Sequence, residues 1–325
     1  MSKVLVTGGA GFIGSNIADL LLEKGYEVIC IDNLSTGSRR NVNKNLKLYV
    51  KDICTADIRN VFKKEKPDYV VHEAAQINVR TSVSDPAFDA KVNIIGSINV
   101  LECCKDYNVK KVVYASSGGA IYGEPVKLPA DEKHQIRPLC PYGASKYSVE
   151  NYLSIYKKTY GLDYVALRYA NVYGPRQDPL GEAGVIAIFM NKLSRGEKPV
   201  IYGDGEQSRD FVYVGDVARA NLLALENDTK GTEYNIGTGV ETSVNQLYGK
   251  LRSVFSTGIS AVHADAVPGE VRRIYLDNSL ARKELGWKPV VDLAAGLAKT
   301  HEWFKTVSSA GTAFKTGKSM RGKKP

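Results

Sequence analysis

Val4-Leu5-Val6-Thr7-Gly8-Gly9-Ala10-Gly11-Phe12-Ile13-Gly14 is the stretch that decides the fold. Residues 3–7 form a short run typical of a β-strand, and the apolar residues after the glycines recur at helical spacing. These helical positions are Ile13, Ile17, Leu20, Leu21 and Leu22. Glycines 8, 11 and 14 allow a tight turn and a close backbone approach, so the unpaired N–H groups of the helix can face a pyrophosphate. A strand, a glycine turn and a helix in this order predict a dinucleotide-binding site.

A second strand supports this interpretation and indicates which dinucleotide binds. Residues 27–31 (EVICI) are typical of a buried strand and place Asp32 at its end, eighteen residues after Gly14. A carboxylate there accepts hydrogen bonds from the adenosine ribose and repels a 2′-phosphate. We therefore expect the cofactor to be NAD and not NADP.

Strand and helix patterns keep alternating after Asp32, as in a parallel sheet covered on both faces. Further strands are expected at 47–50, 69–72, 111–115 and 164–168, and helices at 56–64, 88–104 and 141–160. Residues 1–170 are therefore predicted to form an α/β domain with a doubly wound parallel sheet of the Rossmann type. Such sheets bind ligands at the carboxyl ends of their strands.

The pattern changes after residue 170. Short strands at 200–202 and 234–236 alternate with helices at 185–193, 214–224 and 245–254. We expect residues 171–304 to form a smaller substrate-binding lobe, interleaved with the first domain. Residues 305–325 contain six basic residues and no acidic one, and their composition predicts a disordered tail.

The composition excludes several classes of protein. The 325 residues are 43% apolar and 24% charged, as in a globular protein. The net charge of +9 falls to +3 for residues 1–304, so we expect no nucleic-acid partner. No apolar run approaches the ~20 residues of a membrane span, and the first strand leaves no room for a signal peptide. Five cysteines without a C-x-x-C and four scattered histidines predict no disulfide framework and no metal site, and favour the cytoplasm.

Tyr142 and Lys146 form a candidate acid–base pair. They lie four residues apart near the start of a predicted helix, so both side chains project from one face. A phenol has an ordinary pKa near 10, and a neighbouring ammonium together with a positive nicotinamide ring would favour the phenolate. The pair follows the fifth strand of a nucleotide-binding sheet, and this place favours a catalytic role over a surface contact.

Three motifs together resemble the extended short-chain dehydrogenase/reductase family. They are Thr7-Gly8-Gly9-Ala10-Gly11-Phe12-Ile13-Gly14, Tyr142-x-x-x-Lys146 and Asn171-Val172-Tyr173-Gly174-Pro175-Arg176. Within the family, residues 1–304 are most similar to nucleotide-sugar epimerases of the UDP-glucose 4-epimerase type. The resemblance implies a tightly held NAD that takes a hydride from C4 of the sugar and returns it to the opposite face. It also implies a homodimer formed by the helices at 88–104 and 142–160.

The resemblance assigns a role to individual positions. Catalysis falls to Tyr142, Lys146 and an active-site serine. Cofactor contacts fall at Gly8, Gly11, Phe12, Ile13, Gly14, Asp32, Asn33, Asp52, Ile53, Ala74, Ala75, Asn93, Tyr142, Lys146 and Ala170. Substrate contacts fall at Asn171, at Tyr202 on the uracil, at Arg209 on the diphosphate and at Glu270 on the uridine ribose.

The chain departs from the family pattern at three positions. The usual active-site hydroxyl is replaced by Gly118, so we expect Ser117 to bond the sugar oxygen, with Ser116 as the alternative. A common arginine is replaced by Val267, which would shift diphosphate binding to Arg209 or Arg272. A position near Ile274 is often a bulky aromatic in glucose-selective relatives, so an N-acetylated sugar stays open.

Other activities remain open at this point. UDP-glucose/UDP-galactose is the first expectation, and UDP-N-acetylglucosamine or UDP-glucuronate are alternatives. A nucleotide-sugar 4,6-dehydratase or decarboxylase would need a further acid–base residue where this chain has Gly118-Gly119. An NAD-binding sensor is the alternative that is not an enzyme, and it would not require Tyr142 and Lys146.

Overall fold

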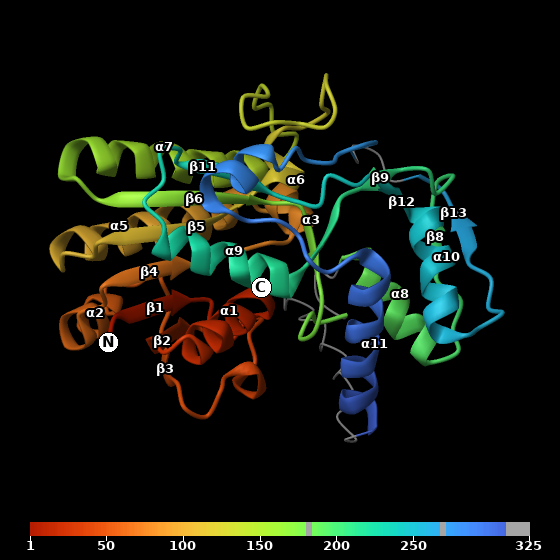
Figure 1. The fold of residues 1–325 in the computed structure, drawn as a ribbon, viewed down its shortest axis with the longest axis horizontal. Helices are drawn as coiled ribbons and strands as arrows, with labels where there is room; N and C mark the ends of the chain where they lie inside the picture. The colour runs from red at the N-terminus through yellow and green to blue at the C-terminus, as the bar shows by residue number, and fades with distance from the viewer. Residues whose placement is uncertain (180–183, 267–270, 310–325) are drawn as a thin grey trace, which may run out of the picture.

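A seven-stranded, entirely parallel sheet forms the centre of the computed structural model, which describes residues 1–179, 184–266 and 271–309. The strands lie in the order β11-β6-β5-β4-β1-β2-β3 (Figure 1). Their bounds are β1 Lys3–Thr7, β2 Glu27–Asp32, β3 Lys47–Val50, β4 Tyr69–His72, β5 Lys111–Ser117, β6 Asp163–Tyr169 and β11 Glu233–Ile236. The order doubles back at β1 and β4, as expected of a doubly wound sheet, and the predicted fold class is confirmed.

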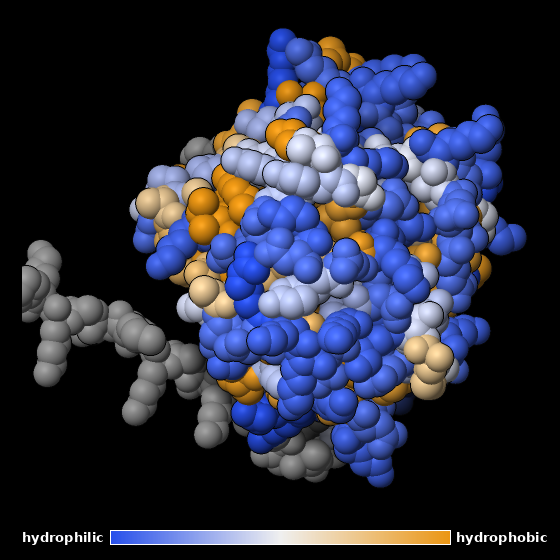
Figure 2. Space-filling view, turned by 90° about the vertical axis from the view of Figure 1, so that its left-hand side faces the viewer, coloured by the Kyte–Doolittle hydropathy of each residue, from blue (hydrophilic) through white to orange (hydrophobic). Residues whose placement is uncertain are grey.

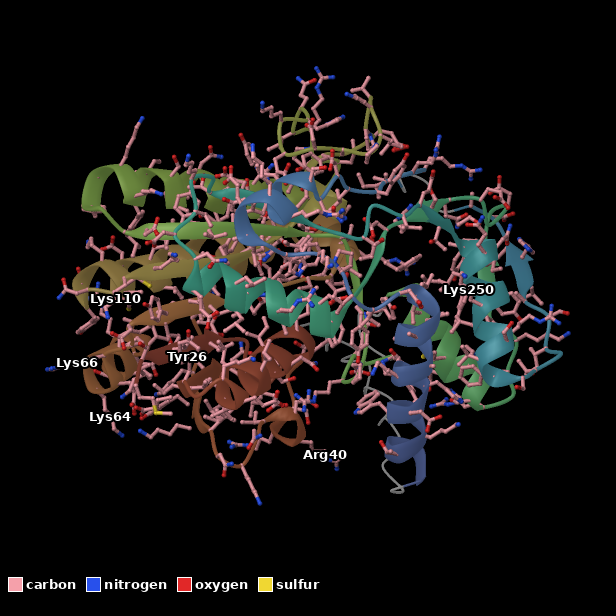
Figure 3. All side chains as sticks on the ribbon, viewed as in Figure 1. Tyr26, Arg40, Lys64, Lys66, Lys110 and Lys250 are labelled. Carbon is pink, nitrogen blue, oxygen red and sulfur yellow. The ribbon has the colours of Figure 1, made fainter. Side chains whose placement is uncertain are left out.

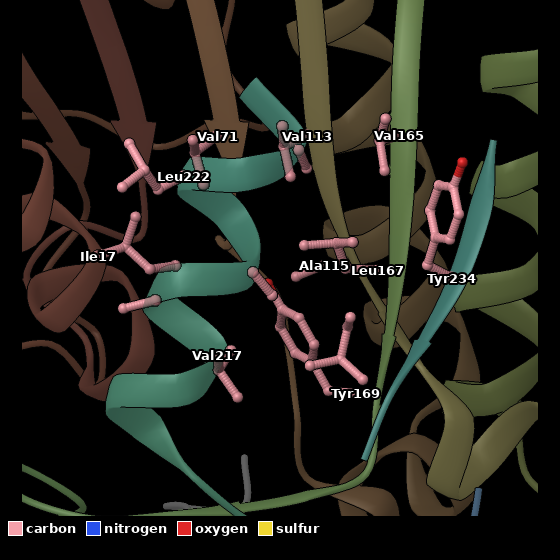
Figure 4. Close-up of a cluster of buried hydrophobic side chains, with 14 of the residues drawn as sticks. Ile17, Val71, Val113, Ala115, Val165, Leu167, Tyr169, Val217, Leu222 and Tyr234 are labelled. Atoms are coloured by element: carbon pink, nitrogen blue, oxygen red, sulfur yellow. The ribbon is translucent and has the colours of Figure 1, made fainter. Parts of the chain in front are cut away.

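Helices cover both faces of this sheet. On one face lie α1 (Phe12–Glu23) and α9 (Val214–Glu226), and on the other α2 (Ile58–Glu65), α5 (Gly96–Asp106) and α7 (Pro141–Tyr160). Strand side chains alternate between the two layers, so Val113, Val165 and Leu167 pack against α9 (Figure 4). Full burial of each such aliphatic side chain contributes about 1.5–3 kcal/mol, and the two cores make the sheet a rigid platform for its carboxyl edge.

The helix expected at 88–104 is longer and has an irregular middle. Residues 86–106 are helical throughout: α4 (Pro86–Ala90), a π-helical segment (Lys91–Ile95) and α5 follow one another. Before them comes α3 (Val79–Ser84), and a short helix α6 (Gly118–Ile121) follows β5. β5 itself extends two residues beyond the prediction and therefore includes Ser116 and Ser117.

A smaller lobe has its own apolar core. It contains α8 (Val185–Ser194), α10 (Val244–Phe255), α11 (Leu293–Ser309) and the strand pair β8 (Val200–Tyr202) and β13 (Val262–Ala264). Two short pairs, β7 (Asn171–Tyr173) with β10 (Phe211–Tyr213) and β9 (Ser208–Arg209) with β12 (Thr242–Ser243), run between it and the sheet. In Figure 1 this lobe lies to the right of the sheet.

Two expectations about the second half of the chain are wrong. The strand expected in the smaller lobe at 234–236 is the seventh strand of the main sheet, where Tyr234 and Ile236 pair with Leu167 and Tyr169. Both side chains are completely buried, so this strand belongs to the core of the main sheet. The tail is predicted to be disordered from 305, but α11 continues to Ser309, and residues 310–325 lie outside the described residues.

One face of the molecule is mostly polar (Figure 2). Figure 2 shows a hydrophilic face with small, separate apolar patches. Basic side chains are spread around the molecule, with Lys64, Lys66 and Lys110 beside one end of the sheet and Lys250 on the smaller lobe (Figure 3). Across residues 1–179, 184–266 and 271–309, no helix is both long and apolar enough to span a bilayer.

Candidate active site

The glycine turn brings β1, α1 and the end of β4 into close contact. Gly8 has a φ of +69°, a left-handed conformation that favours glycine. A Cβ on Gly8 would lie 2.8 Å from the backbone nitrogen of Ala74, and a Cβ on Gly14 would collide with the carbonyl oxygen of Gly8. The turn can close only without these side chains, and it places the N-terminus of α1, an anion-binding position, at the carboxyl edge of the sheet.

Asp32 lies at the end of β2, beside this turn. Its carboxylate accepts hydrogen bonds from the backbone N–H groups of Ala10 (3.0 Å) and Leu34 (2.7 Å). These two donors orient the carboxylate and leave further lone pairs for the hydroxyls of a ribose. Asp32 is therefore placed where the sequence predicts the adenosine ribose.

Asn33 and Asp52 form a second polar pair near Asp32. The Asn33 amide donates to Asp52 over 3.1 Å, and the Cys54 backbone N–H donates to the same carboxylate. Burial raises the pKa of Asp52, but these hydrogen bonds outweigh burial and leave the pKa below its ordinary value. Asp52 thus presents an anionic acceptor at the edge of the cleft described next.

A cleft of about 820 Å³, counted out to the open solvent, lies beside the turn. Its lining includes most of the predicted cofactor residues: Gly8, Gly11, Phe12, Ile13, Gly14, Asp32, Asn33, Asp52, Ile53, Ala74 and Ala75. The remaining lining residues are Ile31, Ser35, Thr36, Lys51, Glu73, Ile77 and Val92. A glycine turn without Cβ atoms, a ribose-binding carboxylate and an apolar wall are what an extended dinucleotide needs, so the residues present fit NAD.

Asn93 and Ala170 do not line this cleft. Asn93 is buried, and its amide accepts from the Gln76 N–H (2.8 Å) and donates to the Gln76 carbonyl (2.9 Å). Asn93 therefore holds the loop after β4 in place, and its contact with the cofactor stays a prediction. Ala170 is also buried, with its N–H donating to the Ile236 carbonyl over 3.0 Å.

Tyr142 and Ser117 meet where β5 ends and α7 begins. Pro141 occupies the first turn of α7, where a proline costs no hydrogen bond. One residue later comes Tyr142, and the Ser117 hydroxyl lies close enough to its phenol to act on the pKa. Burial raises the pKa of the phenol well above its ordinary value, and the Ser117 hydroxyl opposes that rise. The chain without cofactor therefore holds the phenol in its protonated form, and the phenolate expected beside a positive nicotinamide ring stays a prediction.

Lys146 lies one turn further along the same helix and is 3% exposed. Its Nζ donates to the Ala115 carbonyl (2.7 Å) and lies 5.9 Å from the centre of the Tyr142 ring. Burial lowers the pKa of Lys146 to about 8, against the carboxylates of Glu73, Asp89 and Glu150, which raise it. The end of β5 thus holds the Lys146 ammonium next to the phenol. Its pKa of about 8 lies close to neutral pH.

Ser116 points to the opposite face of β5 from Ser117. Its hydroxyl donates to Glu150 (2.6 Å), and Glu150 forms a two-pronged ion pair with Arg168 (3.0 and 2.7 Å). All three side chains are buried. Adjacent residues of a strand face opposite ways, so the contacts of Ser116 favour Ser117 as the serine that bonds the sugar oxygen, which stays a prediction.

Gly118 shows why the usual hydroxyl is absent from this chain. A Cβ there would lie 2.5 Å from Cδ1 of Leu276 and 3.1 Å from the Arg168 carbonyl oxygen. Leu276 is fully buried, so a serine at 118 would require repacking. Ile274, from the same segment, is also buried in the core.

Asn171 and Tyr202 lie on separate strands beyond the sheet. Asn171 is half-buried at the start of β7, and its Oδ1 would lie 3.5 Å from a Cβ on Gly119. It therefore lies beside the Ser117–Gly119 segment. Tyr202, at the end of β8, leaves 46% of its surface exposed, as an aromatic platform would.

Arg209 and Arg272 are the described cationic candidates for the diphosphate. Arg209 lies on β9 and donates to the Ser208 carbonyl (2.8 Å). Arg272 makes two 2.8 Å hydrogen bonds to Asp204, and its N–H donates to Glu124. Two further positions lie outside the described residues: Glu270, which is predicted to contact the uridine ribose, and Val267, which replaces a common arginine.

Glu73 and the Asp89–Ser145 pair were missed by the sequence analysis. Glu73 lines the cleft next to the predicted Ala74, and a charged residue directly after a buried strand was a usable signal. Asp89 accepts from Ser145 on α7 (2.6 Å) and from Gln76 and Asn93, a link that only the fold reveals. Within the described ranges there is no group of three or more metal-ligating side chains.

Sequence and structure comparisons both find nucleotide-sugar epimerases. The sequence model of the NAD dependent epimerase/dehydratase family matches residues 4–237. A crystal structure of UDP-glucose 4-epimerase with UDP-glucose from Thermotoga maritima is similar at 50% identity and a TM-score of 0.92, over 94% of this chain and 99% of that one. The UDP-glucose 4-epimerase of Thermus thermophilus, in complex with NAD, is 43% identical with a TM-score of 0.88, over 93% and 99%. The UDP-N-acetylglucosamine 4-epimerase of Methanobrevibacter ruminantium, in complex with UDP-N-acetylmuramic acid, is 41% identical with a TM-score of 0.89, over 94% and 98%.

Proposed function

The chain belongs to the NAD-dependent epimerase/dehydratase family, and we propose that it is an NAD-dependent UDP-sugar 4-epimerase that interconverts UDP-glucose and UDP-galactose. The observation that carries the proposal is that Ser117, Tyr142 and Lys146 lie together, at the same edge of the sheet as a cleft that fits NAD. Similarity over nearly the whole chain to an epimerase solved with UDP-glucose supports the choice of sugar.

The residues of the site perform the proton chemistry of this reaction. Bound NAD supplies a hydride acceptor at C4 of the sugar and later returns the hydride. Tyr142 accepts the proton of the C4 hydroxyl as C4 is oxidised, and it gives the proton back when C4 is reduced. Ser117 donates to or accepts from the same oxygen and holds it during both half-reactions. Lys146 remains beside the phenol and favours its ionised form.

We assign the two parts of the chain different tasks. Residues 1–170 bind the cofactor, and the lobe within 171–304 holds the nucleotide. Asn171 binds the sugar, and the exposed ring of Tyr202 binds the uracil. The cations Arg209 and Arg272 bind the diphosphate. An aromatic face suits a base and a guanidinium fork suits phosphate oxygens. Glu270 completes this proposed set at the uridine ribose.

The test is product analysis with the purified full-length protein. UDP-glucose should yield UDP-galactose, separated by chromatography, without net accumulation of NADH. UDP-N-acetylglucosamine is the second candidate substrate, favoured by the similarity to the Methanobrevibacter enzyme, and UDP-glucuronate is the third substrate to assay. No product from any of the three, in a preparation that binds NAD, would contradict the proposal.

We also propose a homodimer and a cytoplasmic location. Exposed apolar side chains on α3, α4, the π-helical segment and α7 form a face suited to a second copy: Val79, Val83, Phe88, Ile95, Tyr152 and Ile155. Light scattering should report twice the chain mass. All five cysteines are unpaired, which suits a reducing compartment.

A further inference from the structure

Glu73 is a charged side chain in the wall of the cofactor cleft that the mechanism above does not use. It follows β4 directly, and its backbone carbon would lie 3.0 Å from a Cβ on Gly8. Its Oε1 accepts a 2.8 Å hydrogen bond from the hydroxyl of Tyr169, the last residue of β6, and that hydroxyl also accepts from Asn221 of α9. Figure 4 shows Tyr169 between α9 and the end of β6. Glu73 is thus fixed in position by two layers of the fold.

Three carboxylates raise the pKa of Lys146, and they differ in how their charge is compensated. Glu150 is paired with Arg168, and Asp89 accepts from three donors. Glu73 accepts a single hydrogen bond among the described residues, from a neutral phenol. Of the three, Glu73 is therefore the carboxylate with the fewest hydrogen-bond donors among the described residues.

The electrostatics of Glu73 and Lys146 are linked. Burial raises the pKa of Glu73 to about 7, while the Tyr169 hydroxyl and Lys146 oppose the rise. Glu73 is in turn the strongest of the three carboxylates that support the charge of Lys146. Near neutral pH, the carboxyl group of Glu73 can therefore gain or lose its proton in response to one nearby charge.

We propose that Glu73 is the counter-charge for the oxidised cofactor, ionised opposite the positive ring of NAD⁺ and protonated beside neutral NADH, so that the cleft prefers NAD⁺. The ring must lie near Tyr142 if Tyr142 serves the reacting carbon, and Glu73 lines the same cleft and contributes to the raised pKa of Tyr142. In this one respect the inference rests on the proposed function. An epimerase that returns its hydride in every cycle needs its cofactor oxidised between turnovers, and Glu73 would hold it in that state.

The test compares the dissociation constants for NAD⁺ and NADH by calorimetry at pH 7.5 in three proteins. Glu73→Gln keeps the shape of the side chain and a partner for Tyr169 but removes the charge. Glu233→Gln is the matched control, because Glu233 also accepts from a tyrosine hydroxyl (Tyr164, 2.9 Å) but at the amino end of the sheet. Glu73→Gln should weaken NAD⁺ relative to NADH about ten-fold, equivalent to 1.4 kcal/mol, and Glu233→Gln less than two-fold.

The pH dependence gives a second measurement. As the pH falls through about 7, Glu73 takes up a proton, so the preference of the unmodified protein for NAD⁺ should fall. Lys146, with a pKa near 8, adds a change in the same direction that the variant retains. The tyrosines and the histidine nearby lie outside this range, because burial raises the pKa values of Tyr114, Tyr142 and Tyr169 and lowers that of His72 to about 3. Asp89 and Glu150 are the remaining charged groups that act on Lys146.

Tyr169→Phe separates charge from shape. It removes the hydrogen bond that lowers the pKa of Glu73, so the preference for NAD⁺ should persist while its midpoint moves to higher pH. An unchanged ratio of NAD⁺ to NADH affinity in folded Glu73→Gln, or an equal change in Glu233→Gln, would overturn the inference. Epimerisation is measured separately, so its absence alongside the predicted affinity shift would contradict only the proposed function.

Discussion

The buried Arg168–Glu150 ion pair should be the most sensitive polar contact of the catalytic helix. Arg168→Met keeps much of the apolar stem but removes four hydrogen bonds, two to Glu150 (3.0 and 2.7 Å), one to the Tyr122 hydroxyl (3.1 Å) and one to the Glu132 carbonyl (3.0 Å). Glu150 is 4% exposed and would keep only the Ser116 hydroxyl. Breaking a buried pair from one side costs about 3–5 kcal/mol, and we expect that loss here in the free energy of unfolding.

The control has the same geometry at the surface. Arg273 also makes a two-pronged pair, with Glu241 at 2.6 and 2.7 Å, but its side chain is 55% exposed. Arg273→Met should therefore cost about 0–1 kcal/mol. Urea unfolding followed by tryptophan fluorescence measures both variants, because Trp287 is completely buried in the main core.

A double variant tests the cause of the loss. Adding Glu150→Gln to Arg168→Met removes the uncompensated charge, so at least half of the lost free energy should return. The reasoning would be refuted if Arg168→Met and Arg273→Met lost similar amounts, or if the double variant were no more stable than Arg168→Met.

Four shorter predictions concern the site. Tyr142→Phe should lower turnover about 10²–10⁴-fold, the usual contribution of a positioned acid–base group, with NAD still bound; chromatographic assay and calorimetry check both. Ser117→Ala should lower kcat more than Ser116→Ala, whereas Ser116→Ala should lower urea stability by about 1–3 kcal/mol, because it leaves buried Glu150 with one donor fewer; the reverse order would contradict the assignment. Asp32→Asn should raise the affinity for NADP relative to NAD, and unchanged discrimination in calorimetry would contradict the role of Asp32. Without cofactor, folded Glu73 (pKa about 7) binds more protons than unfolded Glu73 (4.5) between these pH values, so its contribution to stability falls as the pH rises from 4.5 to 7; urea midpoints should change less with pH in Glu73→Gln than in Glu233→Gln.

The sequence alone was sufficient for the features that depend on local pattern. The glycine turn needs residues without a Cβ at 8 and 14, and Asp32 needs only to end the second strand, so both can be recognised from a short window. The same holds for Tyr142 and Lys146, whose shared helix face follows from their spacing. A parallel sheet then brings the ends of all its strands to one edge, so that positions recognised separately in the sequence come to lie together.

Other features depend on packing between distant segments, and only the tertiary structure decided them. Tyr234 and Ile236 belong to the main sheet because they fill the space beside β6, which no local pattern shows. Ser116 and Ser117 are chemically identical neighbours, and the Glu150–Arg168 pair that Ser116 contacts comes from segments more than thirty and fifty residues away. The environment of Tyr142 likewise comes from burial. Spacing reports which groups are near each other, but desolvation, which raises the pKa of that phenol, depends on everything packed around it.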